Sequence, residues 1–417
     1  MDVTPLRASR EYRLLFTGQF VSYFGSAISY VVLPVQMYQL TKSSFAVGML
    51  GVAEFVPMFA MSFVGGALAD YVDRRRLIIV SEIGMTLCCG VLAVNALLPQ
   101  PQVWILFLIA SLFAALSAMH RPAMEALTPR ILPPEMMPAV GALRGFTFSF
   151  NFIVGPAIAG VIIASFGAAF AYAVDAATYV ISLIAVLMIR AVPPPPRRDD
   201  ADRPSLQAIK DAWAYARRRQ ELLGTYVIDL IAMFFGMPMA LFPAIAENFG
   251  GASVGWFYSM MAVGPFLVSL TSGWTSRINK HGAAITIAVA IWGLAIVGFG
   301  MTGSLWLALF FLALASAADM VSGLFRMTMW NQTIPDHLRG RMASIEMISY
   351  STGPYLGNAE AGLVAAVFGL RASVVSGGVL CVLGAGALAL LLPRFIRYDG
   401  REGLARKQAE EMARLPQ

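Results

Sequence analysis

The chain has 417 residues, of which 58% are hydrophobic and only 13% are charged, whereas soluble proteins carry roughly 25% charged residues. A mean hydropathy of +0.70 over this length excludes a water-soluble protein, because a soluble chain of this size would divide into domains with polar surfaces. The formal charge of +6 comes from short basic flanks between apolar runs, a pattern that indicates orientation in a membrane rather than nucleic-acid binding.

The side chains that usually hold metals or form disulfides are few and scattered. Cys88, Cys89 and Cys381 lie inside apolar runs without metal-ligand spacing, so we expect neither a metal site nor a disulfide framework. Residues 1–13 are polar and basic and contain no cleavage site, so we expect no signal peptide. We expect no cofactor.

Twelve apolar runs follow one another along the chain. A helix that crosses a bilayer needs about 20 apolar residues. Runs of this length occupy 12–38, 44–69, 77–98, 102–124, 136–165, 168–190, 221–247, 252–275, 281–301, 304–331, 340–366 and 369–392. We predict an all-α integral membrane protein in which each run forms one span.

The longest connection, 191–220, divides the spans into two sets of six. It contains four consecutive prolines, 193–196, which prevent a helix from continuing. Its second part places apolar residues at helical spacing opposite charged ones, which predicts an amphipathic helix on the membrane surface. The apolar residues are Leu206, Ile209, Trp213 and Ala216.

Four parts of the chain follow from this division. We predict an N-terminal six-helix bundle over 1–190, a cytoplasmic linker over 191–220, a C-terminal six-helix bundle over 221–392, and a cytoplasmic tail over 393–417.

Lysines and arginines predict the orientation of the spans. Of the 30 such residues, Lys42 and Arg371 lie in loops that we expect outside, and Arg144 and Arg326 lie within spans. All the others lie on the side that holds both termini and the linker, and basic loops stay in the cytoplasm. We predict a multi-pass protein of the bacterial inner membrane with both termini cytoplasmic.

The two sets of spans carry matching residues. At one constant spacing, Pro133 matches Pro335, Gly155 matches Gly357, Gly160 matches Gly362, and Phe166-Gly167 matches Phe368-Gly369. Chance agreement among frequent glycines and prolines is the alternative. The shared context of a loop followed by a helix favours a duplicated six-helix unit.

The loop after the second span carries the most specific motif. It reads Gly66-Ala67-Leu68-Ala69-Asp70-Tyr71-Val72-Asp73-Arg74-Arg75-Arg76. This stretch resembles the G-x-L-A-D-R-x-G-R-R signature of the major facilitator superfamily, with Tyr71 in place of Arg and Asp73 in place of Gly. The resemblance implies twelve helices arranged as two pseudo-symmetric six-helix bundles.

The same resemblance implies a gating motif. Asp70, with Gly66, Arg74 and Arg75, would latch the two halves together when the transport cavity faces outward. Arg121, at the end of the fourth span, would be a partner of Asp70. The alternative is that the arginines only anchor the loop in the cytoplasm.

The fifth span carries a second motif, Gly155-Pro156 followed by Gly160. A proline kinks a helix by removing one backbone hydrogen bond, and flanking glycines let helices approach closely. The motif resembles the Gly-Pro signature of exporters in the superfamily, which its importers mostly lack. An ordinary packing kink is the alternative.

Weaker matches, in chain order, resemble the enterobactin exporter family. They lie at 33–36, 40–48, 95–101, 193–196 and 241–249. The resemblance implies a substrate that is a catecholate siderophore or a related amphipathic molecule.

Ionisable residues inside spans need a reason, because each costs of order 3 kcal/mol or more at the bilayer centre. Asp319 and Arg326 are two helical turns apart and share a face. Asp229 lies in the seventh span, which together with the tenth lines the cavity in the superfamily fold. We predict that these three residues bind substrate or protons, because a carboxylate in a low-dielectric pocket can carry a proton near neutral pH.

Glu54 and Arg144 are further candidates for substrate or proton binding. The alternative for each is a structural pairing between helices. We favour that structural interpretation for Glu82, Arg121 and Glu125, which lie near the cytoplasmic rim.

Polar and aromatic residues of the first and seventh spans complete the candidate site. Spacings of three and four place one polar stripe on the first span, and we expect it to line the cavity. Its members are Gln19, Ser22, Tyr23, Ser26 and Tyr30. Phe234 adds an aromatic ring, and aromatic rings with Arg326 or Arg144 suit the ring and oxygens of a catechol.

We therefore expect a secondary active exporter, coupled to protons as an antiporter, of a siderophore or a related small molecule. A multidrug exporter of the same fold is the alternative, and a lipid-flipping variant is a third. The sequence disfavours an enzyme and an ATP-driven pump, because it has no hydrolase motif and no phosphate-binding loop. The expected partners are the small-molecule substrate, protons and the lipid bilayer, without nucleic acid, and we expect a monomer.

Overall fold

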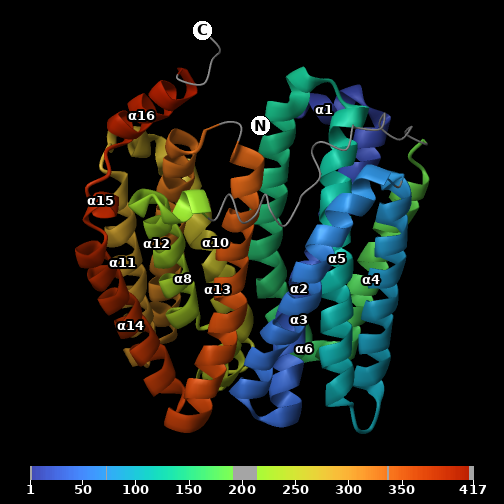
Figure 1. Ribbon diagram of the computed structural model, residues 1–417. Coiled ribbons are helices and arrows are strands. Elements are labelled where there is room, and N and C mark those ends of the chain that lie inside the picture. The colour runs from blue at the N-terminus through green and yellow to red at the C-terminus, as the bar shows by residue number, and fades with distance from the viewer. Residues whose placement is uncertain (1, 72, 191–213, 336–337, 413–417) are drawn as a thin grey trace. The chain divides into compact units, whose positions relative to one another are not determined.

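The computed structural model describes residues 2–71, 73–190, 214–335 and 338–412, and within these residues the chain is helical without β-strands (Figure 1). Contacts within the chain form two compact units. The first unit comprises Met1–Arg198 and Phe242–Ser259, and the second comprises Asp199–Leu241 and Met260–Gln417. The predicted bundle boundaries, 1–190 and 221–392, differ from this grouping at 242–259 and stay a prediction.

Helices of the first unit follow the predicted spans. They are α1 (Thr4–Ala8), α2 (Arg10–Thr41), α3 (Ser44–Tyr71), α4 (Arg74–Leu97), α5 (Val103–Ile131), η1 (Pro134–Met136) and α6 (Met137–Leu187). The short helices α9 (Phe242–Ala246) and η4 (Glu247–Phe249), with the beginning of α10 (Ser253–Thr271), are grouped with this unit.

The second unit contains the remaining helices and the rest of α10. They are α8 (Gln220–Phe235), η3 (Met239–Leu241), η5 (Ser272–Arg277), α11 (His281–Met301), α12 (Leu305–Thr333), α13 (Arg339–Phe368), α14 (Leu370–Leu391), α15 (Pro393–Ile396) and α16 (Gly400–Met412). The predicted linker helix falls largely on residues outside the described part of the chain. Ala216, at its end, is buried against Leu222 and Tyr226.

Capping side chains determine where two of the long helices begin. The Ser9 hydroxyl accepts a hydrogen bond from the Tyr12 backbone N–H at the start of α2. Asp73 accepts from the Arg75 backbone N–H at 2.9 Å at the start of α4. An oxygen-bearing side chain at this position satisfies one of the unpaired N–H groups of the first turn. The aspartate that replaces Gly in the superfamily signature therefore starts the next helix.

The chain reverses direction at the same place in both halves of the repeat. Gly167 has φ 78° and ψ 175°, and its match Gly369 has φ 91° and ψ 158°. Glycine adopts positive φ without the steric cost that a Cβ would add. The turn at Gly167 lies within α6, which therefore contains two predicted spans, 136–165 and 168–190. The shared conformation supports the predicted duplication.

One predicted span is not a continuous helix. The sequence predicts a span over 221–247, but α8 ends at Phe235, with Gly236 as its cap and Pro238 soon after. Proline supplies no N–H for a helix hydrogen bond. The Ala240 N–H freed by this interruption is bonded to the Asn358 side-chain oxygen at 2.9 Å. A half-buried side chain thus supplies a hydrogen bond that a membrane interior cannot offer.

The other predicted spans correspond to long apolar helices. In the described residues, 10 helices are long and apolar enough to cross a membrane. On α4, the exposed face is apolar, with Val80, Leu87 and Val94, while Glu82 and Asn95 are buried. This reverses the pattern of a water-soluble helix and is typical of a helix surrounded by lipid. The prediction of an all-α membrane fold is confirmed.

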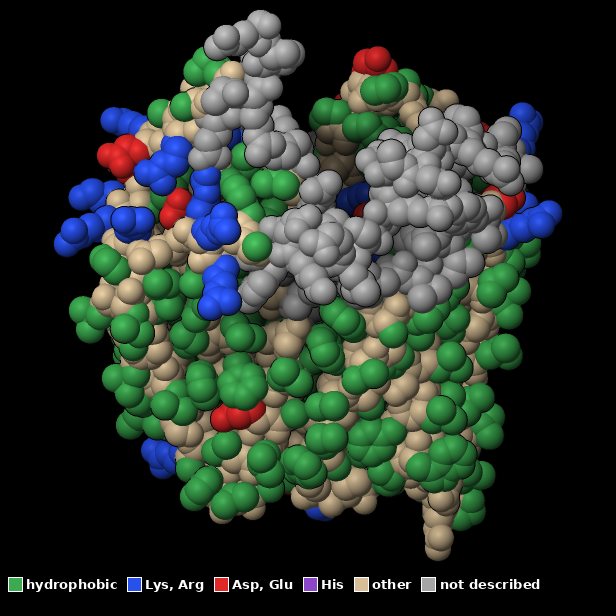
Figure 2. Space-filling model, viewed as in Figure 1, with side chains coloured by type: hydrophobic (Ala, Val, Ile, Leu, Met, Phe, Trp, Pro, Cys, Tyr) green, Lys and Arg blue, Asp and Glu red, His purple; other side chains and the backbone are tan. Residues whose placement is uncertain are grey.

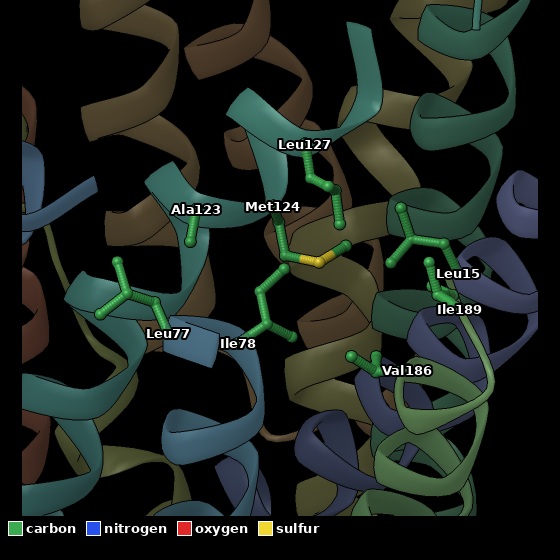
Figure 3. Close-up of a cluster of buried hydrophobic side chains, with 8 residues drawn as sticks. All are labelled: Leu15, Leu77, Ile78, Ala123, Met124, Leu127, Val186 and Ile189. Atoms are coloured by element: carbon green, nitrogen blue, oxygen red, sulfur yellow. The ribbon is translucent and has the colours of Figure 1, made fainter. Parts of the chain in front are cut away.

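An apolar cluster joins four helices near one end of the first unit. Figure 3 shows its side chains close together, from α2, α4, α5, the end of α6 and Ile189 directly after it. The members are Leu15, Leu77, Ile78, Ala123, Met124, Leu127, Val186 and Ile189.

The surface changes character along the helices of the second unit. On the face shown in Figure 2, hydrophobic side chains cover the body of the molecule, and basic side chains gather over α15 and α16. The exposed arginines are Arg394 on α15, Arg397 directly after it, and Arg401 and Arg406 on α16.

Candidate functional site

Three ionisable side chains meet inside the second unit. Arg326, on α12, forms an ion pair with Asp229 of α8, and its Nη2 lies 3.7 Å from Oδ1 of Asp319, two turns earlier on α12. Asp229 is 3% exposed and Arg326 is 8% exposed. The structure therefore brings together the three residues that the sequence predicted at this site, and the two-turn spacing of Asp319 and Arg326 places them on one face as expected.

This cluster carries two carboxylates for one guanidinium. A buried charge is stable only when it is paired, because its desolvation costs several kcal/mol. Arg326 can neutralise one carboxylate fully and the other in part. A proton on Asp319 or on Asp229 would bring the cluster to neutrality, so the arrangement can hold a proton.

A cavity of ≈ 510 Å³ opens beside Arg326 within the second unit. It is lined by Gly323, Arg326, Met327, Trp330, Asn331, Ile334, Glu346 and Tyr350. This volume falls in the range of pockets that enclose small organic molecules. The cavity combines one cation, one carboxylate, an amide and two aromatic rings.

Trp330 has a fixed position in the cavity wall. Its indole N–H donates to the Thr225 hydroxyl at 2.9 Å, and its ring stacks on Tyr226 with centroids 5.8 Å apart. Tyr350, by contrast, exposes 49% of its surface. A rigid ring and an accessible ring, with Arg326 nearby, suit a ligand that is itself aromatic and bears oxygens.

The first unit presents an aromatic surface of its own on α2 and α6. The ring of Phe20 lies 6.4 Å from Phe146 and 5.4 Å from Phe150, measured between centroids. Arg144 is exposed on the same helix as these two phenylalanines, and its Nη2 donates to the Thr128 hydroxyl at 2.7 Å. Arg144 thus keeps its charge at the surface of the unit rather than in a buried pair.

The predicted polar stripe of the first span is divided between two environments. Gln19 is buried between helices of the first unit, and Ser26 is bonded to Tyr179 at 2.7 Å. Tyr23 and Tyr30 instead expose 40% and 46% of their surfaces. Helical spacing groups residues on a broad face but does not show which edge of that face packs against a neighbouring helix.

Two remaining candidates lie apart from the ionic cluster. Glu54 is half-buried on α3 and makes no ion pair with a residue of the described part of the chain. Phe234, at the end of α8, contacts Phe235 edge to face with centroids 5.0 Å apart.

The predicted gating residues are described only in part. Gly66 and Asp70 lie near the end of α3, where the structure describes the helix but not its side chains or their surroundings. Arg75 donates to the carbonyls of Val186 and Leu187, at 3.2 and 2.7 Å, at the end of α6. Such bonds satisfy unpaired carbonyls at a helix C-terminus.

The neighbouring arginines make similar contacts. Arg74 donates to the Ala126 carbonyl of α5 at 2.9 Å, and Arg121 pairs with Glu125 at 3.2 Å. Arg74 and Arg75 therefore tie three helices of the first unit together, whatever further role they have.

The exporter motif lies at close helix contacts. A Cβ on Gly155 would lie 2.6 Å from the Cβ of Ala27 on α2, and a Cβ on Gly160 would lie 2.6 Å from the Ala252 carbonyl oxygen. Pro156 between them is buried inside α6. The two glycines are needed because no side chain fits at either contact.

Comparison with known proteins agrees with these features. The family described as transmembrane secretion effector matches residues 2–412. The chain belongs to this family, a branch of the major facilitator superfamily. The superfamily resemblance predicted from the motifs is confirmed.

Two relatives of the chain carry the name of an exporter. The chain is 28% identical over 405 residues to enterobactin exporter EntS of Shigella boydii serotype 18 and of Escherichia coli O81, with 94% of each chain covered. The chain is therefore a multi-pass membrane exporter of the major facilitator superfamily, and it is a transporter rather than an enzyme.

Solved structures of transporters share the fold of this chain. A bacterial homologue of the human lysosomal transporter Spinster, in an inward-facing and unoccupied conformation, aligns with TM-score 0.72 and 16% identity over 93% of this chain and 98% of that one. Nucleoside transporter NupG aligns with TM-score 0.71 and 12% identity over 93% and 98%. Peptide transporter POT in complex with sulfate aligns with TM-score 0.75 and 12% identity over 94% and 96%.

Sequence reasoning missed the aromatic cavity wall, Trp330 and Tyr350. The only signal in the sequence was that Trp330 lies on the tenth span, which the superfamily resemblance places beside the cavity. For Glu82 the sequence favoured a structural pairing between helices but did not identify the partner. Glu82 is fully buried, and His120 lies 3.4 Å away.

Proposed function

We propose that the protein is a proton-coupled antiporter that exports a catecholate siderophore or a closely related aromatic molecule. The observation that supports this most directly is the cavity beside Arg326, where a cation lies among aromatic side chains. A catecholate carries both an aromatic ring and anionic oxygens, so one ligand satisfies both features. The relatives named enterobactin exporter support the same substrate class.

The coupling ion is proposed from the charges of the second unit. Asp229 and Asp319 share Arg326, so one carboxylate stays without a full counter-charge, and a proton and a hydrogen-bond donor of the substrate, such as a catechol hydroxyl, are alternative partners for it. Competition between proton and substrate for one site is the simplest basis of antiport. Release of the substrate on one side would then accompany proton binding.

We also propose the orientation and the gate. The excess of lysines and arginines on one side supports cytoplasmic termini in a bacterial inner membrane. Asp70 would act as the latch of the gating motif, with Arg121 as its partner, and Arg74 and Arg75 would hold the loop against α5 and α6.

Transport by the purified protein in lipid vesicles tests substrate and coupling together. Vesicles with an acidic interior are given external enterobactin, and accumulation inside is measured. A gradient of one pH unit supports about tenfold accumulation for each proton exchanged, since about 1.4 kcal/mol corresponds to a factor of ten. Accumulation should collapse on addition of a protonophore.

The outcomes separate the alternatives. Enterobactin uptake that is equal with and without the pH gradient would exclude proton antiport. A protein that accumulates ethidium but not enterobactin under the same gradient is a multidrug antiporter instead. Empty vesicles and vesicles treated with protonophore serve as the two baselines.

A further inference from the structure

A layer of buried polar side chains crosses the first unit between four helices. Glu82, on α4, is fully buried. Its Oε1 accepts hydrogen bonds from Gln19 Nε2 of α2 at 2.8 Å and from the Ser182 hydroxyl of α6 at 2.7 Å. His120 Nε2 of α5 lies 3.4 Å from the same oxygen.

Two acceptors in this layer lack donors. Glu82 Oε2 and Gln19 Oε1 are buried and have no hydrogen-bond partner among the described residues, and His120 Nε2 approaches Glu82 Oε1 without forming a hydrogen bond. An unsatisfied buried acceptor costs about 1–3 kcal/mol. A proton on Glu82 Oε2 converts one of these acceptors into a donor, so the layer is built to accommodate a proton.

The apolar cluster of Figure 3 lies one helical turn from this layer on all four helices. Leu15, Ile78, Met124 and Val186 are each four residues from Gln19, Glu82, His120 and Ser182 respectively. Residues four apart lie one above the other on a helix. The cluster therefore separates the Glu82 layer from the nearer end of the unit.

Asp175 forms a second buried layer on the other side of the first. It is fully buried on α6. Its carboxyl group accepts from the Cys89 thiol of α4 at 3.3 Å and from the Thr178 hydroxyl at 3.4 Å. A Cβ on Gly25 of α2 would lie 2.5 Å from Asp175 Oδ1, so the space around this carboxyl is closely filled.

The two layers are in register on the helices that they share. Cys89 is two turns from Glu82 on α4, and Asp175 is two turns from Ser182 on α6, which separates the layers by about 10 Å along the helices. Tyr179 lies between Ser182 and Asp175 on the same face, and its hydroxyl bonds to Ser26 of α2 at 2.7 Å. Hydroxyl groups therefore occupy the interval between the two carboxyl groups.

The charges around each carboxyl decide its protonation. Asp175 faces Cys89 from α4, Gly25 from α2, and Thr178, Tyr172 and Tyr179 from its own helix, so no cation among the described residues compensates it. An isolated buried carboxylate is far less stable than the neutral acid. Without a cation beside it, the enclosed Asp175 favours the neutral, proton-bearing form.

Glu82 differs because His120 faces it. From α2 it faces Gln19, with Tyr23 farther out, and from α6 it faces Ser182. Arg121 and Glu125 follow His120 on α5, but they pair with each other at the surface. The buried pair Glu82–His120 is neutral overall only when it holds one proton, on the carboxyl or on the imidazole.

We propose that Asp175 and the Glu82–His120 pair are two proton-binding sites of the first unit, joined through the hydroxyls of Ser182, Tyr179 and Ser26. One proton would leave a carboxyl group as a second proton arrives through these hydroxyls, so that no unpaired charge remains in the interior. This inference rests on the proposed proton coupling. It places part of the proton pathway in the first unit, away from Arg326.

Infrared spectroscopy tests the protonation without any substrate. The C=O stretching band of protonated carboxyl groups is recorded for the protein in lipid, from mildly acidic to alkaline pH. Wild-type protein labelled with ¹³C in the aspartate carboxyl should show a shifted band, and Asp175→Asn should remove the part that persists at neutral pH. Glu247→Gln, at an exposed carboxylate paired with Lys42, is the control and should leave the band unchanged.

Vesicle transport of enterobactin tests the role of both sites. Asp175→Asn and Glu82→Gln keep the shape of the side chains, so downhill flux should stay near that of wild type. Accumulation driven by one pH unit should fall from about tenfold to none, because the proton no longer contributes its free energy.

Each of three outcomes would overturn a different part of the proposal. A wild-type band that neither isotope nor Asp175→Asn alters overturns the assignment of Asp175. Full accumulation by Glu82→Gln, or loss of downhill flux in parallel with accumulation, overturns the coupling role. If wild-type protein does not transport enterobactin, the proposed substrate fails, and the infrared result still decides whether these groups hold protons.

Discussion

Arg326 shares its single charge between two carboxylates, and this makes the three residues unequal. Asp229 is more deeply buried than Asp319 and is paired directly with the guanidinium. When Asp229 is neutralised, Arg326 still has Asp319 as a partner. When Arg326 is neutralised, two carboxylates lose their cation at once. The cost of removing a charge should therefore depend on which member is removed.

We predict that Arg326→Gln destabilises the protein more than Asp229→Asn does. Removal of one partner of a buried ion pair costs about 3–5 kcal/mol, because the other charge remains buried and unpaired. The double variant should be more stable than Arg326→Gln alone, since it leaves only Asp319 without its cation. The measurement is the apparent unfolding temperature of each purified variant in detergent.

Lys42→Gln is the control for this series. Lys42 and Glu247 form a pair in the first unit whose side chains are 64% and 50% exposed. Exposed pairs contribute about 0–1 kcal/mol, so this variant should unfold close to the wild-type temperature. Strictly additive effects of Arg326→Gln and Asp229→Asn would show that the two charges do not depend on each other.

Sequence reasoning found the charges of the second unit more readily than those of the first. Asp319 and Arg326 could be placed on one face because their spacing alone fixes it. Glu82 could not be placed, because its meeting with His120 and Ser182 depends on how three helices pack. Spacing within one helix is a local property, whereas a contact between helices is a tertiary one.

Glycines fix how closely paired helices approach in both units. In the first unit, Gly155 of α6 faces Ala27 of α2. In the second, its match Gly357 of α13 faces α8, where a Cβ would lie 2.2 Å from the Met233 carbonyl oxygen. Matching glycines therefore serve matching helix pairs, which the repeat in the sequence predicted and the helix contacts explain.

We predict that Gly357→Ala lowers stability although alanine favours helices. The added methyl group meets backbone oxygen atoms of Met233 and Phe234, at 2.2 and 2.8 Å, and backbone cannot move aside as a flexible side chain can. Overpacking of this kind costs about 1–3 kcal/mol. Thermal unfolding followed by tryptophan fluorescence should therefore show a transition several degrees lower.

Gly386→Ala supplies the comparison within the same unit. A Cβ at Gly386, on α14, meets nothing within 4 Å. Here alanine should leave the unfolding temperature unchanged or raise it, because glycine is less favourable than alanine inside a helix. Equal transitions for the two variants would show that α13 can move away from α8 without cost.

The interruption after Phe235 shows the limit of reading elements from hydropathy. The apolar run 221–247 is long enough for one span, but Gly236 and Pro238 end the helix inside it. Hydropathy reports how well a segment suits lipid, not whether its backbone is continuous. The turns at Gly167 and Gly369 were predictable as boundaries because a glycine follows an aromatic residue at the same place in both halves.

The whole chain is organised by an even number of apolar spans and by the side on which its basic residues lie. Span number follows from hydropathy, and the fold is confirmed by the family and by solved structures. Orientation rests on a different cause, since it depends on the cost of moving lysine and arginine across a membrane. It requires a direct measurement.

Cysteine labelling can make that measurement because the native thiols are buried and should not react with the label. Cys88, Cys89 and Cys381 are all buried, so a membrane-impermeant maleimide should report only an introduced cysteine. We predict that Gln100→Cys and Ser304→Cys, in exposed loops, react in intact spheroplasts. Arg401→Cys, on exposed α16, should react only after the membrane is permeabilised.

This labelling pattern follows from charge alone. The loops at Gln100 and Ser304 carry no lysine or arginine, whereas α15 and α16 carry exposed arginines that hold their end of the chain in the cytoplasm. Permeabilised spheroplasts, in which all three variants should react, control for local accessibility. Reaction of Arg401→Cys in intact spheroplasts to the same extent as Gln100→Cys would place α16 on the outer side of the membrane. The proposed cytoplasmic location of the termini and of the gating motif would then be wrong.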